Sequence, residues 1–490
     1  MLTPDTPDEL ARRRLRIAVV GDAMLDGWLC GDSNRLCREA PAPVVEITSA
    51  VERPGGAANT AANLAALGAE AVLIAVTGAD PDGARLRREL DAAGVRTEAM
   101  LVEHGRRTMA KRRIVAGAQL IARFDEGDTG AVRPSTGRAL AGVLCEVVPR
   151  CDAVLVCDYG AGTLTDAVRA ELVRLRTSMP LLVADAHDLR PWAAVRPDVV
   201  TPNAGEAARL LGATWTGDGR SVAVENRADD LRAATGADAV VVTLDRDGAV
   251  LLPPDGPVHR TWAQPAPESQ ASGAGDTFVA ALTTALAGGL PAPVAVEFAQ
   301  AAADVVVGRP GTSVCTTAQL TERLGGFRAA VLNHDELAGA VSAHRAAGRR
   351  IVFTNGCFDV LHRGHVAYLN QAKRLGDVLV VAVNDDSGVR RLKGPGRPVN
   401  SASDRAAVLA ALSCVDHVTT FGADTTAGLI TRLRPEVYAK GGDYTPEMLP
   451  ETPTVRACGG EVRILDYLPD RSTTAVINRI RAEAGAPGRR

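Results

Sequence analysis

The sequence predicts an α/β protein in two parts, each with a mainly parallel sheet covered by helices. Short apolar runs alternate with helical patterns along most of the chain, as expected for parallel strands joined by crossover helices. Many of these runs end in Asp, Asn or Gly, which places polar groups at the edge where open α/β sheets bind ligands. The length of 490 residues exceeds what one hydrophobic core usually holds, so we expect at least two domains.

Composition and charge argue against several classes of partner. The net charge of −3 provides no field for holding a polyanion, so we expect no nucleic-acid partner. No apolar run approaches the length of a membrane span, and we expect neither a signal peptide nor a membrane partner. The nine cysteines include no C-x-x-C pair and several lie in apolar runs, which favours reduced thiols and a cytoplasmic location.

The first domain is predicted over residues 16–325, after a flexible tail over residues 1–15. Apolar residues at helical spacing predict helices that include Ala57–Leu67 and Ala84–Ala93. Strands are predicted at Arg16–Gly21, Ala71–Val76, Ala153–Asp158, Leu181–Asp185, Asp198–Thr201 and Ala239–Leu244.

A different pattern occupies Arg107–Asp125. It alternates, turns at Ala116-Gly117-Ala118 and alternates again, which predicts a β-hairpin. With Pro43–Ile47, this hairpin is expected to form a small flap over the ligand edge of the sheet. Such a flap would exclude water when it closes.

A first glycine-rich stretch, Gly55-Gly56, leads into a helix that carries Asn59. Small residues let a polyhydroxylated ligand approach the backbone, and the Asn59 amide offers both a donor and an acceptor. Gly-Gly before a helix is more often only a turn, so the stretch is weak when taken alone.

A second glycine-rich stretch, Gly273-Ala274-Gly275, opens the apolar helix Phe278–Leu286. Its small residues expose backbone N–H groups at a helix start, which suits a transferring phosphoryl group. Asp276 follows in the first helical turn. It is either a favourable partner of the helix dipole or a general base that takes the proton of a sugar hydroxyl, a role worth about 10²–10⁴-fold.

These stretches resemble the two signatures of the ribokinase-like (PfkB) sugar kinases, and Thr201-Pro-Asn-Ala-Gly-Glu206 resembles that family's nucleotide-site motif. The motifs stand in the family's order over residues 16–320. The resemblance implies a ribokinase-like α/β domain with a small β flap, in which Asp276 is the catalytic base. It implies a sugar site at Asp22, Gly55, Gly56 and Asn59. It implies ATP and anion-hole contacts from Asn203, Gly205, Glu206, Gly273, Ala274 and Gly275.

The second part is predicted as a linker helix over residues 326–348 and a domain over residues 349–490. Its central stretch, Ile351–Asp377, has a buried strand, a glycine-punctuated turn and a helix whose start aims N–H groups at one point, which suits phosphate. His362 and His365 lie on one face of that first turn, where they are candidates for holding phosphate oxygens during in-line transfer. The histidine pair has two alternative explanations, half of a metal site and an ordinary capped helix start. No nearby cysteine or carboxylate completes a metal-ligand set, so we predict no metal site.

Two further polar stretches of this domain have alternative explanations. A basic glycine-proline loop with Lys393 and Arg397 is either a solvated charge run or a source of cations for a leaving pyrophosphate. Ser472-Thr473-Thr474 stands at a predicted helix start, where it either caps the helix or binds a triphosphate. Further strands are predicted at Val378–Val383, Val437–Lys440 and Glu461–Tyr467.

His362-Arg-Gly-His365 resembles the H-x-G-H signature of the nucleotidylyltransferase superfamily. The resemblance implies a Rossmann-like nucleotidylyltransferase α/β domain in which His362 and His365 are catalytic. It implies nucleotide contacts from Asn355, Gly356, Cys357, Phe358, Asp359, Lys393, Arg397, Lys440, Ser472, Thr473 and Thr474.

Both motif sets together, over nearly the whole chain, resemble the bifunctional ADP-heptose synthesis enzymes. This resemblance implies ATP-dependent phosphorylation of D-glycero-β-D-manno-heptose 7-phosphate at C1, and transfer of AMP from a second ATP to heptose 1-phosphate with release of pyrophosphate. Sugar phosphates and ATP are the implied small-molecule partners. Mg²⁺ is expected at both sites from the chemistry, and related kinases pair across the flap, which suggests a homodimer.

Three positions depart from the kinase pattern of that family. Gln270, Ala161 and His187 stand where the family usually has Asp, Lys and Lys, and each change removes charge near the triphosphate. Two alternatives therefore stay open. The kinase domain is degenerate and binds sugar phosphate as a regulatory module, or the same chemistry acts on a different sugar phosphate or uses CTP.

Overall fold

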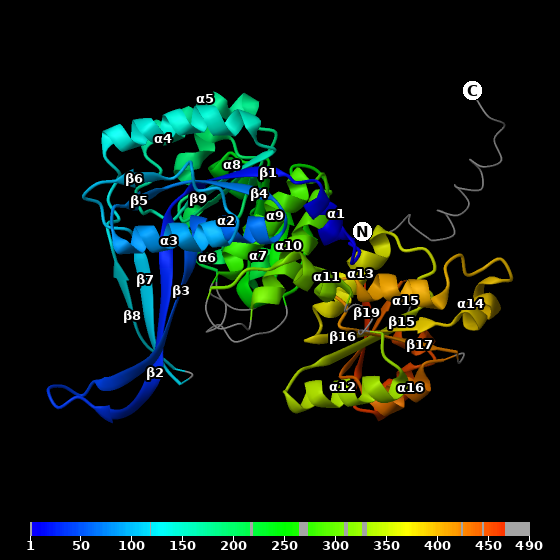
Figure 1. Ribbon diagram of the computed structural model, residues 1–490. Helices are drawn as coiled ribbons and strands as arrows, with labels where there is room; N and C mark the ends of the chain where they lie inside the picture. The colour runs from blue at the N-terminus through cyan, green and yellow to red at the C-terminus, as the bar shows by residue number, and fades with distance from the viewer. Residues whose placement is uncertain are drawn as a thin grey trace, which may run out of the picture. The chain divides into compact units, whose positions relative to one another are not determined.

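The computed structural model divides into two compact units, Met1–Leu324 and Gly325–Arg490. It describes residues 2–117, 119–215, 219–263, 273–307, 312–325, 331–422, 425–442 and 445–465. Each unit has its own sheet and hydrophobic core (Figure 1). Among the described residues, no helix is long and apolar enough to cross a membrane.

The main sheet of the first unit has eight strands in the order β14-β13-β12-β11-β10-β9-β1-β4. The six strands from β12 to β4 run parallel, and β13 and β14 add two antiparallel strands at one edge. Their Val-, Leu- and Ala-rich sequences are buried on both faces, as a parallel sheet between two helical layers requires. The strands are β1 (Arg16–Gly21), β4 (Glu70–Ile74), β9 (Ala153–Asp158), β10 (Leu182–Ala186), β11 (Val199–Val200), β12 (Ala239–Thr243), β13 (Ala249–Leu252) and β14 (His259–Arg260).

Helices cover both faces of this sheet (Figure 1). Leu144 of α4 and Leu172 of α5 share a core with Val154 and Val156 of β9, whereas α2, α9 and α10 pack against one another on the opposite face. The helices of the unit are α1 (Thr6–Arg12), α2 (Ala57–Ala66), α3 (Pro81–Ala92), α4 (Pro134–Val147), α5 (Asp166–Leu175), α6 (Ala204–Leu210), α7 (Arg220–Glu225), α8 (Ala228–Thr235), α9 (Ala274–Ala287), α10 (Ala292–Val306) and α11 (Thr317–Gly325).

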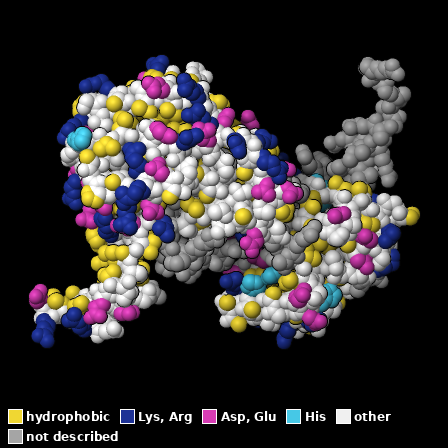
Figure 2. Space-filling model, viewed as in Figure 1, with side chains coloured by type: hydrophobic (Ala, Val, Ile, Leu, Met, Phe, Trp, Pro, Cys, Tyr) yellow, Lys and Arg dark blue, Asp and Glu magenta, His cyan; other side chains and the backbone are white. Residues whose placement is uncertain are grey.

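The flap is a four-stranded sheet in the order β3-β2-β7-β8 that extends from the first unit (Figure 1). The predicted hairpin is present, with its turn at Gly117, and Ala118 lies outside the described residues. On the face seen in Figure 2, hydrophobic side chains gather on the flap, and charged side chains stand among them toward its end. Its exposed large hydrophobic residues are Leu36, Ile47, Val51, Leu120 and Phe124. The strands are β2 (Ala23–Leu36), β3 (Pro43–Gly56), β7 (Ala110–Ala116) and β8 (Gln119–Glu126), and a separate pair joins β5 (Val76–Gly78) to β6 (Leu101–Glu103).

The structure corrects three sequence-based predictions in this unit. The predicted tail contains α1, because Leu10 packs at Gly288 with 3% of its surface exposed and the Arg13 guanidinium donates to the Gly288 carbonyl at 2.6 Å. The strand predicted at Ala71–Val76 is divided between β4 and β5. Helix α3 starts earlier than predicted, because the Asp80 carboxylate caps it by accepting from the Gly83 N–H at 2.8 Å.

The second unit has five parallel strands in the order β17-β16-β15-β18-β19. The segment predicted as a linker contains α12, which belongs to this unit because Leu337 and Val341 are part of its core. The end of the strand predicted at Glu461–Tyr467 lies outside the described residues. The elements are α12 (His334–Ala346), β15 (Ile351–Gly356), α13 (Arg363–Lys373), β16 (Val378–Asn384), α14 (Asp386–Lys393), α15 (Ala402–Ala410), β17 (His417–Phe421), α16 (Ala427–Leu433), β18 (Val437–Gly441), α17 (Thr452–Ala457) and β19 (Glu461–Leu465).

The substitution Leu10→Ala tests whether α1 is an integral part of the first unit. Removing a buried leucine side chain leaves a cavity and is expected to lower the free energy of unfolding by about 2–5 kcal/mol, measured by denaturant titration. Glu9→Ala, on the exposed side of the same helix, is the matched control and should change it by less than about 0.5 kcal/mol. A Leu10→Ala protein as stable as the control would show that residues 1–15 are a free tail.

Candidate active sites

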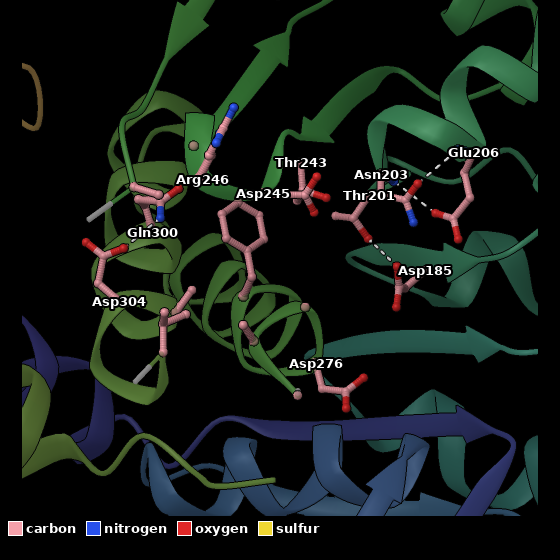
Figure 3. A pocket seen from close by; sticks show the side chains of 18 of the residues that line it. Asp185, Thr201, Asn203, Glu206, Thr243, Asp245, Arg246, Asp276, Gln300 and Asp304 are labelled. Atoms are coloured by element: carbon pink, nitrogen blue, oxygen red, sulfur yellow. Dashed lines mark hydrogen bonds between the residues drawn. The ribbon is translucent and has the colours of Figure 1, made fainter. Parts of the chain in front are cut away.

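A cavity of about 330 Å³ lies at the carboxyl edge of the first unit's main sheet. In Figure 3, Asp185, Thr201, Asn203 and Glu206 lie along one side, and Gln300 and Asp304 lie on the other. Asp276 stands at the lower end of that view, on the first turn of α9. The cavity therefore joins the ends of β10, β11 and β12 to the start of a helix, which is where α/β sheets bind phosphorylated ligands.

The start of α9 depends on a glycine. Gly273 precedes the helix with φ of 83°, a conformation that L side chains rarely adopt. A Cβ at this position would lie 3.0 Å from the Asn59 amide nitrogen and 2.9 Å from the Thr312 side chain. The chain can therefore bring Gly273, Ala274 and Gly275 against the cavity only because the first of them lacks a side chain.

The Asp276 carboxylate is held by two hydrogen bonds from distant parts of the chain. Asn59 Nδ2 donates to Asp276 Oδ2 at 2.8 Å, and the Tyr159 hydroxyl lies 2.9 Å from Asp276 Oδ1. The same hydroxyl also lies 2.9 Å from Asp185 Oδ2, and Thr201 donates to Asp185 Oδ1 at 3.0 Å. A phenol has one proton, so it cannot donate to both carboxylates at once. The arrangement therefore favours an additional proton shared among Asp185, Tyr159 and Asp276.

Burial makes both carboxyl groups weak acids. Desolvation is the main cause that raises the pKa of Asp276 to about 7, and the negative charge of Asp185 raises it further while the Asn59 and Tyr159 hydrogen bonds lower it. Desolvation likewise raises the pKa of Asp185 to about 6. A carboxylate with a pKa near neutrality is a stronger base than an ordinary aspartate, which suits proton abstraction.

The nucleotide motif of the first unit forms the start of α6. Asn203 and Glu206 make a capping box, in which each side chain accepts from the other residue's N–H at 2.9 Å. Glu206 Oε1 also lies 2.8 Å from His187 Nδ1, and this hydrogen bond is the main cause that raises the His187 pKa. Asn203, Glu206 and His187 all line the cavity, whereas Gly205 is not among its lining residues.

The structure corrects the prediction that Asp22 binds sugar. Its carboxylate is 1% exposed and accepts from the backbone N–H groups of Tyr159, Ala161 and Thr163 at 3.0, 2.9 and 3.1 Å. Asp22 therefore shapes the loop that carries Tyr159. Asn59 was also predicted to bind sugar, and its amide nitrogen instead positions Asp276.

Asp26, four residues further along, is a candidate that sequence reasoning missed. A Cβ built on Gly55 would lie 2.7 Å from Asp26 Oδ2, so this carboxylate stands directly beside the glycine pair. Thr312 donates to the same oxygen at 3.0 Å. Gly56, with φ of 56°, then starts α2. The signal that could have found Asp26 is its place near the start of β2, just after the chain passes from β1 of the main sheet into the flap.

Two of the three departures from the kinase family pattern, Ala161 and His187, lie among the described residues, and their contacts are known. The Ala161 N–H donates to Asp22, and its carbonyl accepts from Arg106 at 2.7 Å. The His187 imidazole faces the cavity beside Glu206. Gln270 lies outside the described residues. A lysine-like cation is thus absent at Ala161, while His187 places a titratable base next to the nucleotide motif.

The second candidate site lies in the second unit, at the start of α13. His362 caps this helix, because its Nδ1 accepts from the Gly364 N–H at 3.1 Å. The His362 and His365 rings stack with their centroids 3.9 Å apart. Burial and then repulsion from His362 lower the pKa of His365 to about 4, so this imidazole is neutral at pH 7. It can therefore donate a hydrogen bond to phosphate without carrying a full charge.

The turn before α13 is held tightly. Phe358 adopts φ of 46°, and a Cβ on Gly356 would lie 3.0 Å from the Phe358 ring, so the position favours glycine. Lys440 Nζ donates to Asn355 Oδ1 at 2.9 Å. Burial lowers the Lys440 pKa. These contacts place a cation and an amide at the carboxyl end of β15.

The structure corrects the prediction that Asp359 contacts the nucleotide. The Asp359 carboxylate is 1% exposed; it accepts from the Arg397 side chain and, at 2.6 Å, from the Val399 N–H. Asp359 and the Arg397 Nε therefore anchor the loop that follows α14. Lys393 at the end of α14 is exposed, and its positive charge contributes to lowering the pKa of His365.

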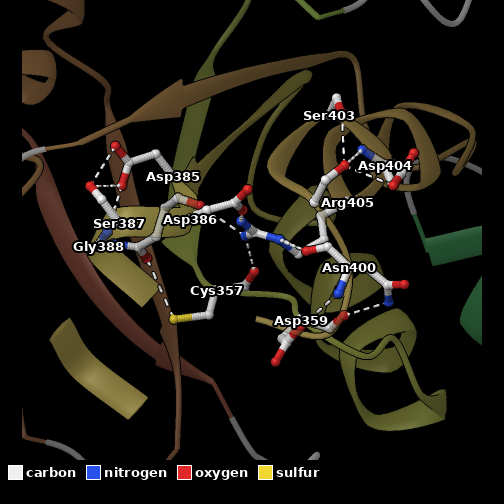
Figure 4. A network of polar contacts seen from close by, with 12 residues as sticks. Cys357, Asp359, Asp385, Asp386, Ser387, Gly388, Asn400, Ser403, Asp404 and Arg405 are labelled. Atoms are coloured by element: carbon white, nitrogen blue, oxygen red, sulfur yellow. Dashed lines mark hydrogen bonds and ion pairs between the residues drawn. The ribbon is translucent and has the colours of Figure 1, made fainter. Parts of the chain in front are cut away.

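Arg405 is a second residue that sequence reasoning missed. It is 2% exposed, and Figure 4 shows its guanidinium reaching from α15 toward Cys357 and Asp386. It donates to the carbonyls of Cys357 and Asn384 at 2.6 and 2.8 Å and to Asp386 Oδ1 at 2.7 Å. Arg405 thus ties the ends of β15 and β16 together. Ser472, Thr473 and Thr474 lie outside the described residues.

Comparisons with known proteins agree with this division of the chain. Residues 14–319 match the pfkB family carbohydrate kinases and residues 353–479 match the Cytidylyltransferase-like family. Phosphofructokinase-2 from Escherichia coli, in complex with substrates and products, superposes with a TM-score of 0.55 and 20% identity over 64% of this chain and 99% of that chain. Arabidopsis thaliana ribokinase, complexed with ribose and ATP, superposes with a TM-score of 0.50 and 21% identity over 63% of this chain and 98% of that chain. These two likenesses show the fold of the first unit.

The fold and the two sites define a bifunctional enzyme, a carbohydrate kinase joined to a nucleotidyltransferase. Bifunctional protein HldE of Chromohalobacter salexigens is 40% identical over 478 residues, which cover 95% of this chain and 97% of that protein. Bifunctional protein HldE of Halorhodospira halophila is 40% identical over 490 residues, which cover 98% of this chain and 100% of that protein. The chain belongs to the HldE family. The sequence-based assignment of both domains is confirmed.

Two substitutions should move the pH dependence of the kinase in opposite directions. Tyr159→Phe removes a donor that lowers the Asp276 pKa, so the acid limb of kcat/KM should move to higher pH. Asp185→Asn removes a negative charge that raises this pKa, so the limb should move to lower pH. Each shift should be about one pH unit, since a hydrogen bond to a charged group is worth about 1.5–3 kcal/mol.

Asp245→Asn is the matched control for these variants. Asp245 lines the same cavity, but its side chain is 68% exposed, so the acid limb should stay in place. Shifts in the same direction for Tyr159→Phe and Asp185→Asn would contradict a shared hydrogen-bond chain.

Proposed function

We propose that this enzyme makes an ADP-activated heptose in two steps, each with its own ATP. The kinase unit phosphorylates D-glycero-β-D-manno-heptose 7-phosphate at C1, and the second unit transfers AMP from ATP to heptose 1-phosphate. The observation that carries the proposal is that one chain of the HldE family holds a buried base at the start of α9 and a histidine pair at the start of α13. We also propose that it acts in the cytoplasm, where ATP is available.

In the kinase step, Asp276 takes the proton of the anomeric hydroxyl. The sugar oxygen then attacks the γ-phosphorus of ATP, a P–O bond forms, and the bond to the β-phosphate oxygen breaks to release ADP. Backbone N–H groups at the start of α9 stabilise the charge that develops on the transferring phosphoryl group. Asn59 and Tyr159 hold the carboxylate in position through this step.

In the adenylyl transfer step, a phosphate oxygen of heptose 1-phosphate attacks the α-phosphorus of ATP, and pyrophosphate leaves. The nucleophile is already an anion, so the unit needs no strong base. His362 and the neutral His365 donate hydrogen bonds to phosphate oxygens, while Lys440 and Lys393 supply positive charge.

Mg²⁺ is expected to enter both sites bound to ATP. The described residues contain no cluster of three His, Cys, Asp or Glu side chains that would hold a metal ion by themselves. This fits Mg²⁺, which keeps several waters and binds largely through substrate phosphates. When bound, Mg²⁺ would neutralise phosphate charge.

The preserved geometry around Asp276 favours an active kinase over a degenerate regulatory domain. A buried carboxyl held by Asn59 and by a Tyr159 hydroxyl that it shares with Asp185 would be an expensive arrangement for a domain that only binds sugar phosphate. Formation of ADP from ATP and heptose 7-phosphate would eliminate the regulatory alternative. A screen of nucleotides against sugar phosphates would decide whether another sugar phosphate or CTP is used.

Single substitutions should separate the two activities. Asp276→Asn removes the base and should lower the kinase rate by about 10²–10⁴-fold while adenylyl transfer is unchanged. His365→Ala removes a phosphate donor and should lower adenylyl transfer by about 10²–10³-fold while the kinase is unchanged. Each variant serves as the control for the other. If either substitution silenced both activities in folded protein, the two sites would not be independent.

We also propose that the enzyme is a homodimer that pairs through the flap, because Leu120 and Phe124 expose large hydrophobic side chains there. Light scattering should give twice the 51.0 kDa mass of one chain. The double variant Leu120→Glu/Phe124→Glu should give the mass of one chain. Val173→Glu, at an exposed hydrophobic residue of α5, is the matched control and should leave the dimer intact. A monomeric wild-type protein would refute the proposal.

A further inference from the structure

One face of the flap carries four cations and two carboxylates, since the register also pairs Arg53 with Asp26 and Asp125 with Lys111. Strand register pairs Asp26 with Lys111 and Trp28 with Arg113, and on the next strand it pairs Arg113 with Arg123. Residues paired in register point to the same side of a sheet. We name the side with Arg53, Lys111, Arg113 and Arg123 the cation face.

The contacts of Arg112, which lies between Lys111 and Arg113 in the strand, show which way the cation face points. Arg112 projects to the opposite side, where it donates to both carboxylate oxygens of Asp82 on α3 at 2.9 Å. Arg113, on the cation face, lies over the Trp28 ring at 4.9 Å and donates to Asp26 Oδ1 at 3.3 Å. Asp26 stands beside Gly55 and bonds to Thr312. The cation face is therefore the side of the flap that meets the sugar-binding glycines.

Thr312 connects this face to the active site, because it bonds to Asp26 and its side chain would lie 2.9 Å from a Cβ on Gly273, at the start of α9. The charge of Asp26 contributes to raising the pKa of Asp276, and the charge of Lys111 lowers the pKa of His187. His187 lines the nucleotide cavity, whereas Lys111 is not among the lining residues. Lys111 therefore lies outside the lining of the nucleotide cavity, on the face of the flap that carries Asp26.

Lys111 differs from its two neighbours in its partners. Arg113 pairs with Asp26, and Arg123 donates to Asp125 at 2.8 and 2.6 Å. Lys111 is half-buried, and within the described ranges no hydrogen bond or ion pair to its ammonium is found. The two carboxylates that lie opposite Lys111 in the strand register, Asp26 and Asp125, already accept from Arg113 and Arg123. The position of Lys111 therefore suits an anion that arrives with a ligand.

We propose that Lys111 binds the phosphate group that the sugar substrate carries away from its reacting hydroxyl, and so makes the kinase specific for a sugar phosphate over a free sugar. This inference rests on the proposed kinase function. Asp26 and Arg113 lie on either side of the position, where Asp26 is suited to accept from sugar hydroxyls and Arg113 adds positive charge. Closure of the flap brings the Lys111 ammonium onto the phosphate only when that phosphate is present.

The test compares two substrates on one variant. In Lys111→Met, kcat/KM for heptose 7-phosphate should fall by about 10- to 100-fold, the range expected for one charge-assisted hydrogen bond, while kcat/KM for heptose without the phosphate stays within about twofold. The KM for ATP should not change. Lys111→Arg should recover most of the loss, because it restores the charge. Arg107→Met, at an exposed cation just before the same strand, should behave as wild type.

Three results would overturn the inference. An equal loss with both sugars, or a raised KM for ATP, would assign Lys111 to the phosphates of ATP. A Lys111→Met variant with an unchanged kcat/KM for heptose 7-phosphate would show that Lys111 binds no phosphate. Thermal melting of the variant, with Lys111→Gln as a second uncharged substitution, separates a loss of folding from a loss of binding. A wild-type protein that forms no ADP with heptose 7-phosphate would refute the proposed function itself, together with this inference.

Discussion

The kinase unit depends on keeping one carboxylate, Asp276, buried at the start of a helix. Raising its pKa from 3.8 to about 7 costs about 4 kcal/mol of folding free energy once the group is ionised. The penalty is absent below the unfolded pKa and complete above the folded pKa, so it weighs on the protein at neutral pH. Asn59 and Tyr159 offset part of it, and Asp22 holds the loop that carries Tyr159. The site is thus maintained by contacts between segments far apart in sequence.

The second unit, a nucleotidyltransferase, also acts on phosphate groups, but it does so without a buried carboxylate base. Its reacting oxygen already belongs to a phosphate, so the protein needs to stabilise charge and has no proton to remove. In the proposed mechanism the stacked pair of His362 and His365 does this at the start of α13, where burial keeps His365 neutral. In both units the groups proposed to face phosphate lie at the start of a helix after a glycine-containing loop, where backbone N–H groups are available. The chemistry of each nucleophile accounts for the difference between the two sites.

Much of this architecture could be predicted from local sequence patterns. The apolar runs predicted the central strands, and alternation around Gly117 predicted the flap hairpin. The networks could not be predicted, because Tyr159 meets Asp276 across 117 positions and Arg405 meets Cys357 across 48. Carboxylates were the main source of error. Asp22 and Asp359 stand next to ligand motifs, but they bind backbone N–H groups of their own unit, and spacing alone does not distinguish a carboxylate that faces a ligand from one that shapes a loop.

The central claim is that Asp276 titrates near neutrality because the folded chain buries it beside Asp185. The most direct measurement is a ¹³C NMR titration of aspartate carboxyl groups in the full chain, with Asp276→Asn used to assign the signal. A midpoint of about 7 would agree with the account. A midpoint near the ordinary aspartate value of about 3.9 would contradict it, because the carboxylate would then be hydrated and not the organising charge of the site.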